Sequence, residues 1–148
     1  MLGGETNGEL WEWHTDTGWV EVPGSAAAGA NGVELSNDGA TLYVAAWGSQ
    51  SFFRLSRGAA PPVREEIELG FRIDNIHWAH DGMLWGVGQA GPEGWKAVKI
   101  DPETLQVSEV VTVPDTPEFG AGTALVEVGD TFWVGSFRGN RIAIVPAP

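Results

Sequence analysis

Residues 30–39 (ANGVELSNDG), followed by 42–44 (LYV), contain the pattern that determines the fold. The pattern returns at residues 73–82 (IDNIHWAHDG), followed by 84–85 (LW). Short strand-like runs separated by Asp-Gly turns, repeated at an interval of about 40–50 residues, are typical of β-propeller blades and not of helical repeats. The sequence therefore predicts an all-β protein built from propeller blades.

The alignment of the two copies places Asn31 with Asp74 and Asp38 with Asp81, in each case 43 positions apart. A weaker third copy covers residues 121–134. Because equivalent positions of a repeat occupy equivalent places in adjacent blades, the oxygen-bearing side chains of Asn31 and Asp74 are expected at the same point of neighbouring blades.

Composition and charge exclude several classes of function. The chain has 43% hydrophobic and 19% charged residues, which is typical of a globular protein, and its net charge of −12 disfavours binding to nucleic acid or to an anionic membrane. It has no cysteine, which excludes disulfides and thiolate chemistry. We see neither a signal peptide at the start nor an apolar run of about 18 residues, so the expected location is the cytoplasm.

The strand-like runs predict three blades and an additional hairpin within a single domain of 148 residues. An outer-strand hairpin is expected at residues 9–22, a blade at 31–68, a second at 74–112 and an incomplete third at 121–145. The predicted strands number one more than three four-stranded blades require. The strand pairing where the ring would close therefore stays open.

Three blades cannot close around a central axis, since a closed propeller needs about four or more. An open arc would expose an apolar face at each end, which soluble monomers rarely do. Two arcs related by a two-fold axis would form a six-bladed ring, so we expect a homodimer. The alternative is that another chain completes the propeller.

The segments 31–45 (NGVELSNDGATLYVA) and 74–85 (DNIHWAHDGMLW) resemble the senescence-marker-protein-30 (SMP-30)/gluconolactonase family. More broadly they resemble the six-bladed propellers that include paraoxonases and strictosidine synthase-like proteins. The resemblance covers about residues 30–145, the C-terminal half of a typical member. It implies a propeller with a divalent cation, usually calcium, in its central tunnel, and a lactonase or esterase activity.

The resemblance also implies which residues would hold the cation. Asn31 matches the family's Asn, Asp74 matches its Asp, and Asn75 follows Asp74 as in the paraoxonase-like branch. The family's Glu has no match, since Ala121 stands at the nearest position, and no paraoxonase-like histidine pair is evident. One chain offers about three side-chain donors, fewer than the six to eight oxygens that calcium binds. These residues can also simply cap backbone groups where strands begin.

His77 is the tentative general base, because it occupies the position of Glu34 in the preceding blade and a Glu34–His77 contact would orient the imidazole. A hydrogen-bonded interior histidine is the alternative. Trp78, Trp85 and Trp133 occupy equivalent blade positions, and we expect them to pack between sheets. Loops at the tunnel mouth supply the candidate ligand-binding residues, which are Trp47, Gln50, Arg72, Gln89, Phe137 and Arg138.

Two functions remain open at this point. One is a metal-dependent hydrolase that opens a lactone or cleaves an ester, with Asp74 and His77 as catalytic residues. The other is a propeller without catalysis that binds a small molecule or a partner protein.

Overall fold

The computed structural model of the protein describes residues 5–147 and consists of antiparallel β-sheets, as the repeat predicts. In chain order the elements are β1 (Trp11–His14), β2 (Gly18–Glu21), β3 (Ala30–Leu35), β4 (Thr41–Ala46), β5 (Ser51–Ser56), β6 (Arg64–Glu68), β7 (Arg72–Trp78), β8 (Leu84–Gln89), the 3-10 helix η1 (Gly91–Glu93), β9 (Trp95–Ile100), β10 (Val107–Val113), β11 (Phe119–Val128), β12 (Thr131–Gly139) and β13 (Ala143–Pro146).

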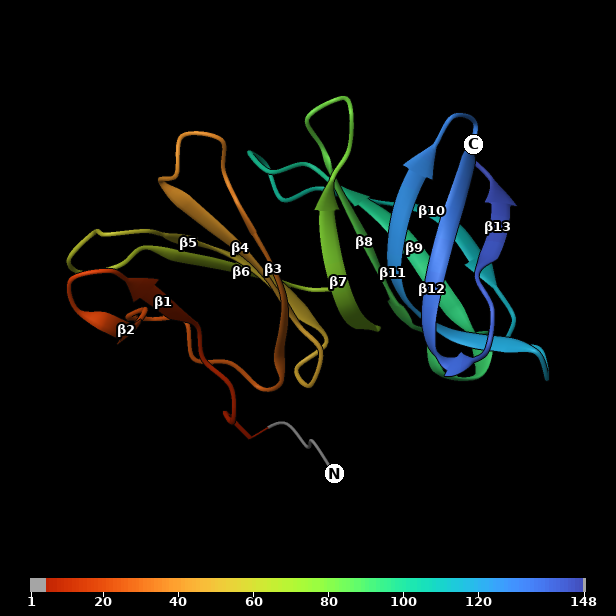
Figure 1. Ribbon diagram of the computed structural model, residues 1–148, viewed down its shortest axis with the longest axis horizontal. Helices are drawn as coiled ribbons and strands as arrows, with labels where there is room; N and C mark the ends of the chain where they lie inside the picture. Colours follow the sequence, from red (N-terminus) through yellow and green to blue (C-terminus); the bar gives the residue numbers. More distant parts are fainter. Residues whose placement is uncertain (1–4, 148) are drawn as a thin grey trace.

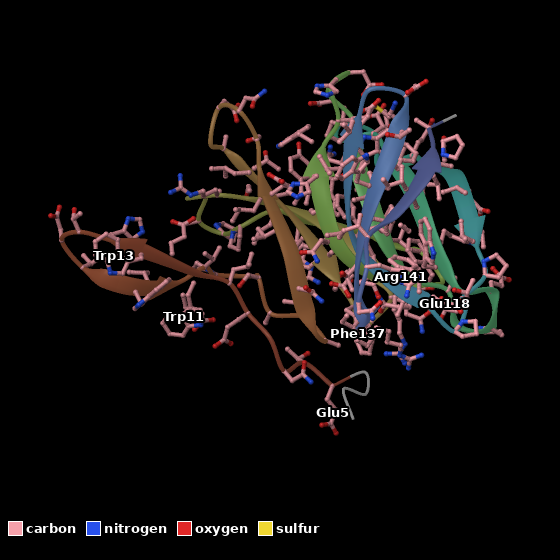
Figure 2. The ribbon with its side chains drawn as sticks, turned by 45° about the vertical axis from the view of Figure 1, so that its right-hand side comes forward. Glu5, Trp11, Trp13, Glu118, Phe137 and Arg141 are labelled. Carbon is pink, nitrogen blue, oxygen red and sulfur yellow. The ribbon has the colours of Figure 1, made fainter. Side chains whose placement is uncertain are left out.

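These strands form an N-terminal hairpin and three blades arranged as an open arc (Figure 1). The hairpin is β1–β2, the first blade is β3–β6, the second blade is β7–β10 and the third blade is β11–β13. Within each blade every strand pairs with its neighbour in the chain. The hairpin projects from the side of the first blade, and its Trp11 and Trp13 lie far from the third blade in Figure 2.

The tight turns between the first two strands of each full blade follow from Asp-Gly pairs. Gly39 has a φ of 74° and Gly82 a φ of 83°, in the left-handed region that glycine adopts without a steric penalty. The preceding aspartates stabilise the turns, since Asp38 accepts a hydrogen bond from the amide of Ala40 and Asp81 from that of Met83.

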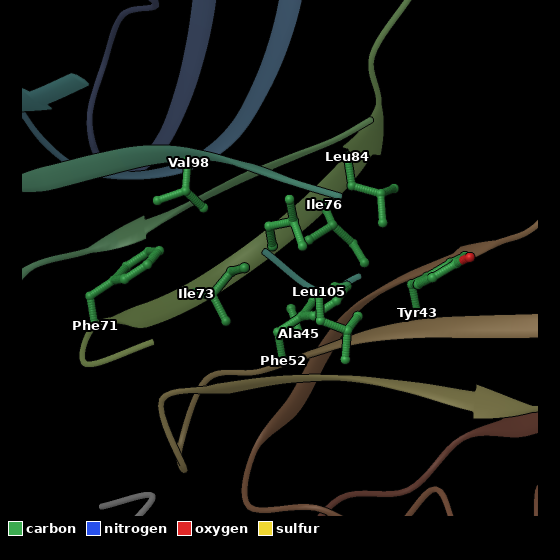
Figure 3. Close-up of a cluster of buried hydrophobic side chains, with 10 residues drawn as sticks. Tyr43, Ala45, Phe52, Phe71, Ile73, Ile76, Leu84, Val98 and Leu105 are labelled. Atoms are coloured by element: carbon green, nitrogen blue, oxygen red, sulfur yellow. The ribbon is translucent and has the colours of Figure 1, made fainter. Parts of the chain in front are cut away.

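Apolar side chains fill the two spaces between adjacent blades. Between the first and second blades, Tyr43 and Phe52 pack against Ile73, Ile76 and other residues of the second blade (Figure 3). Between the second and third blades the core contains Trp85, Trp95, Phe119, Leu125 and Phe132, among others. A third cluster covers the opposite side of the first blade, where Val22 and Ala27 of the N-terminal segment contact β4 and β5.

Strand register identifies the equivalent residues of the three blades. Glu34 pairs with Tyr43, His77 with Trp85, and Val126 with Trp133. Tyr43 and Trp85 are therefore equivalent, and each is buried against the next blade, with 4% and 5% of its surface exposed. Trp133 occupies the same position but is 43% exposed, so the expectation that it packs between sheets is wrong within this chain. The expected equivalence of Trp78 is also wrong, because Trp78 lies on the inner strand β7 and pairs with Leu84.

The structure contains no helix, among residues 5–147, that is long and apolar enough to span a membrane.

Candidate functional site

The innermost strand of each blade carries a β-bulge at the same point. The register shifts between Ala30 and Val33 in β3, between Ile73 and Asn75 in β7, and between Gly122 and Ala124 in β11. A bulge redirects the side chains beside it and is frequent next to active sites. These irregularities place Asn31, Asp74 and Thr123 at equivalent positions. Sequence reasoning missed Thr123, because the third copy of the repeat is too weak to align it.

The inner strands of the first two blades approach closely beside these bulges. A Cβ atom added at Gly32 would lie 2.7 Å from the Cα atom of Asn75 and 2.7 Å from the carbonyl oxygen of Asp74. Only glycine fits such a backbone contact. The glycine after Asn31 thus lets the first blade place its amide side chain against Asp74.

Asp74 is nearly buried, with 8% of its surface exposed, and amide groups surround its carboxylate. The side-chain amide of Asn75 donates to Asp74 Oδ1 at 3.0 Å, and that of Gln89 donates to Asp74 Oδ2 at 3.1 Å. The same amides also donate to the third blade, to the carbonyl oxygens of Thr123 and Gly122 respectively, at 2.9 Å each. Trp47 donates its indole N–H to Gln89 Oε1. The network therefore joins all three blades at Asp74.

Burial raises the pKa of Asp74 above its usual value of 3.8, and hydrogen bonds from Gln89 and Asn31 oppose that rise. Asp74 is absent from the ion pairs of the described residues, so neutral amides alone stabilise its ionised form. A buried carboxylate that lacks a cationic partner is a candidate for proton transfer or for cation binding.

A pocket of about 290 Å³ lies beside this network and shares Trp47 and Gln89 with it, whereas Asp74 itself is behind Gln89 and does not line the pocket. Five of the six residues predicted to line a tunnel-mouth pocket do so, namely Trp47, Arg72, Gln89, Phe137 and Arg138. The sixth, Gln50, lines an adjoining depression together with Arg72 and Gln89. Figure 2 shows Phe137 at one end of the third blade. The topology thus gathers these residues as expected, and their role in binding stays a prediction.

The pocket contains both cationic and acidic groups. The guanidinium of Arg72 stacks on Trp47, with its Cζ 4.2 Å from the ring centroid. Asp115, which sequence reasoning missed, also lines the pocket and accepts a hydrogen bond from the amide of Ala121. Ala121 has a φ of 51°, uncommon for a residue with a Cβ, and it too lines the pocket. The only sequence signal for Asp115 was its place in the loop before β11.

His77 does not line this pocket. Its Nδ1 lies 2.8 Å from Glu34 Oε1, which is the predicted contact between the two blades. The imidazole is 58% exposed, however, so the alternative of an interior histidine is wrong. It borders separate depressions formed with residues such as Trp85 and Val126. Because His77 does not border the pocket, its position does not support a role as a general base there.

The predicted metal ligands Asn31, Asp74 and Asn75 do lie together, because Asn75 donates to Asp74 at 3.0 Å and the side chain of Asn31 is close enough to lower the pKa of Asp74. Carboxylate, amide and carbonyl oxygens are the donors that calcium prefers, so the set fits that cation in kind. It contains a single carboxylate, and no group of three His, Cys, Asp or Glu suited to a metal occurs among residues 5–147.

Comparison with known proteins shows likeness in fold. No family model matches the chain, and no curated protein matches it. Among solved structures, it is similar to a luciferin-regenerating enzyme (TM-score 0.63, 22% identity, covering 90% of this chain and 45% of that one). It is also similar to a streptogramin B lyase (TM-score 0.60, 16% identity, 95% and 48%). A third is the periplasmic gluconolactonase of Pseudomonas aeruginosa (TM-score 0.54, 18% identity, 88% and 38%).

The chain spans less than half the length of these three structures. Membership of the SMP-30/gluconolactonase family stays a prediction, since the identities are low and no family model matches. Together the blades, their antiparallel topology and these neighbours identify the chain, in fold, as a partial β-propeller similar to gluconolactonase-like proteins.

Proposed function

We propose that the protein is a hydrolase that opens a lactone or a similar ester in the pocket beside Asp74. The observation that carries the proposal is a nearly buried carboxylate, with a pKa raised by burial, linked through Gln89 to a pocket that two arginines line. The similarity in fold to a gluconolactonase agrees with this chemistry.

The reaction needs a base, an anion-stabilising group and a bound substrate. Asp74 removes a proton from a water molecule as the water oxygen attacks the lactone carbonyl. The bond between the acyl carbon and the ring oxygen then breaks, and the ring oxygen takes up a proton to become the alcohol of the hydroxy acid. A raised pKa improves a carboxylate as a base near neutral pH.

Arg72 and Arg138 supply the positive charge that the chemistry requires. They bind an anionic group of the substrate or the oxyanion formed at the carbonyl. Trp47 stacks on Arg72 and donates its indole N–H to Gln89. It therefore positions an arginine of the pocket and, through Gln89, the base Asp74. We include calcium in the proposal, with Asn31, Asp74 and Asn75 as its ligands in this chain. When bound, it would polarise the carbonyl.

The test is the hydrolysis of D-glucono-1,5-lactone, followed with a pH indicator and corrected for spontaneous opening. Measurements are made with calcium and with EDTA. We expect Asp74→Asn to lower kcat/KM by roughly 100-fold or more, as for the loss of a general base. Asp16→Asn, which removes an exposed carboxylate from the N-terminal hairpin, should leave the rate unchanged. A wild-type rate no faster than spontaneous opening would refute the hydrolase. Equal rates for wild type and Asp74→Asn would refute Asp74 as its base, and equal rates with calcium and EDTA would refute only the cation.

The second candidate is a binding protein for a small anionic ligand. The stacked Arg72 and the neighbouring Arg138 favour it, because a rigid guanidinium is well suited to bind carboxylate or phosphate. Calorimetric titration with gluconate and 6-phosphogluconate distinguishes the two. Binding that Arg72→Gln abolishes, in a protein that opens no lactone, would support this candidate in place of the hydrolase.

A further inference from the structure

The two ends of the arc expose the two halves of an interface that the chain itself forms twice. We call the side of a blade that faces the next blade in the chain its front face, and the opposite side its rear face. The front face of the first blade packs on the rear face of the second, and the second packs on the third in the same way. Within residues 5–147 no blade packs on the front face of the third blade. On the rear face of the first blade the N-terminal segment covers β4 and β5, whereas Val33 and Leu35 of the inner strand β3 stay exposed.

One repeated position shows that the rear face of the first blade is more exposed than the rear faces of the other two blades. On the inner strands this position is held by Val33, Ile76 and Leu125, which pair with Val44, Gly86 and Val134 respectively. Each of them comes one residue before the inner-strand partner of Tyr43, Trp85 or Trp133. Ile76 and Leu125 are both only 3% exposed, because the preceding blade covers them. Val33 is 45% exposed.

The front face shows the complementary difference. Tyr43 and Trp85 are buried at the two internal interfaces, whereas the equivalent Trp133 is 43% exposed. Other exposed apolar residues lie near Trp133 on the third blade, namely Val126, Val128, Ile142 and Ile144. A cluster of this kind marks an interaction surface in a soluble protein.

The internal interfaces also show which residues would meet. Tyr43 packs edge-on against Trp78, with ring centroids 5.5 Å apart, and Trp85 donates its indole N–H to Glu127 at 3.4 Å. Trp78 and Glu127 are equivalent, since each follows the blade's rear position by two residues. The corresponding residue of the first blade is Leu35, which is 42% exposed.

We propose that the occupant of both faces is a second copy of this chain. Trp133 of each copy packs against Val33 and Leu35 of the other, and repeats the Tyr43–Trp78 type of contact across the interface. One copy covers 45% and 48% of two of its structural neighbours, so two copies have the length of one complete chain of that kind. The front-to-rear contact then occurs twice, related by a two-fold axis, and closes the ring.

The pairing extends to the candidate site. Within one chain the bulge residues Asn31, Asp74 and Thr123 follow one another on adjacent inner strands. In the closed pair, Thr123 of one copy stands beside Asn31 of the other, so a continuous set of bulges surrounds one channel. The interface itself is independent of the proposed hydrolase activity.

The experiment is sedimentation velocity of the full chain from 1 to 100 µM at physiological salt. We expect a species of twice 15.8 kDa. The single variants Trp133→Lys and Val33→Glu should both shift the protein to the monomer, because each places a charge in an apolar contact. The matched control Val63→Glu, at a 60% exposed position in the loop before β6, should stay dimeric. Thermal unfolding followed by circular dichroism is used to check that each variant is folded.

The double variant Trp133→Lys/Val33→Glu distinguishes a front-to-rear dimer from dimers formed by other surfaces. Lys and Glu then face each other in both interfaces, so we expect dimerisation to recover at least 10-fold relative to either single variant. A monomeric wild type at 100 µM, which would indicate that another chain or segment covers these faces, overturns the proposal. Higher oligomers, or a dimer that neither single variant weakens, also overturn it.

Discussion

Gln89→Met tests whether Gln89 maintains the network around Asp74. The glutamine makes three side-chain hydrogen bonds, one of them to the carboxylate of Asp74, and methionine keeps its length without any of them. A bond to an ionised group contributes about 1.5–3 kcal/mol and a neutral one about 0.5–1.5 kcal/mol. Because Gln89 is only half-buried, water replaces part of that loss. We expect the free energy of unfolding to fall by about 2–4 kcal/mol.

The measurement is urea unfolding followed by tryptophan fluorescence, at two protein concentrations so that any effect of association is visible. A melting experiment should show a decrease in Tm of roughly 6–12 °C for a chain of this size. Gln50→Met is the matched control, since Gln50 is also half-buried, borders the same region and makes no side-chain hydrogen bond with the described residues. If both variants stay within about 0.5 kcal/mol of wild type, Gln89 does not hold the blades together and the reasoning fails.

Two further predictions concern Asp74 and its backbone. Burial raises the pKa of Asp74, so the folded protein retains a proton that the unfolded chain releases, and this group's contribution to stability falls as the pH rises from about 3.8 through the raised value. In urea unfolding between pH 4 and 8, the free energy of unfolding should fall less steeply with pH for Asp74→Asn than for Asp16→Asn. Parallel profiles of the two variants would contradict this. Gly32→Ala should destabilise by about 1–3 kcal/mol, because its Cβ meets the backbone of Asn75, whereas Gly135→Ala, with its nearest contact at 3.9 Å, should be close to neutral.

The repeat predicted the fold because a 43-residue period sets both strand order and turn positions. It aligned Asn31 with Asp74 and placed Trp47, Gln89 and Arg138 at the same mouth, where the structure has them. The period also placed Glu34 against His77. These features depend on strand alternation and topology, which the sequence pattern expresses directly.

Other features depend on details that the pattern does not express. The bulge lies at the same point in all three inner strands, but the third copy of the repeat is too weak in sequence to align Thr123 with Asp74. The exposure of Trp133 depends on which faces have a neighbouring blade. His77 lies on the second blade, which has a neighbour on each face, and it is exposed because it borders open depressions against the third blade. Gln89 was expected to line the pocket, but its bond to Asp74 depends on the side-chain conformation of a residue on a different strand.

The most direct test of the proposed role of Asp74 is the pH dependence of kcat/KM for lactone opening, measured in EDTA because a cation bound to Asp74 would lower its pKa. The account predicts a limb that rises as Asp74 ionises, with a midpoint above 3.8, the usual value for an aspartate, and no such limb in Asp74→Asn. A limb of the same midpoint in the variant, or a rate independent of pH in the wild type, would contradict the account.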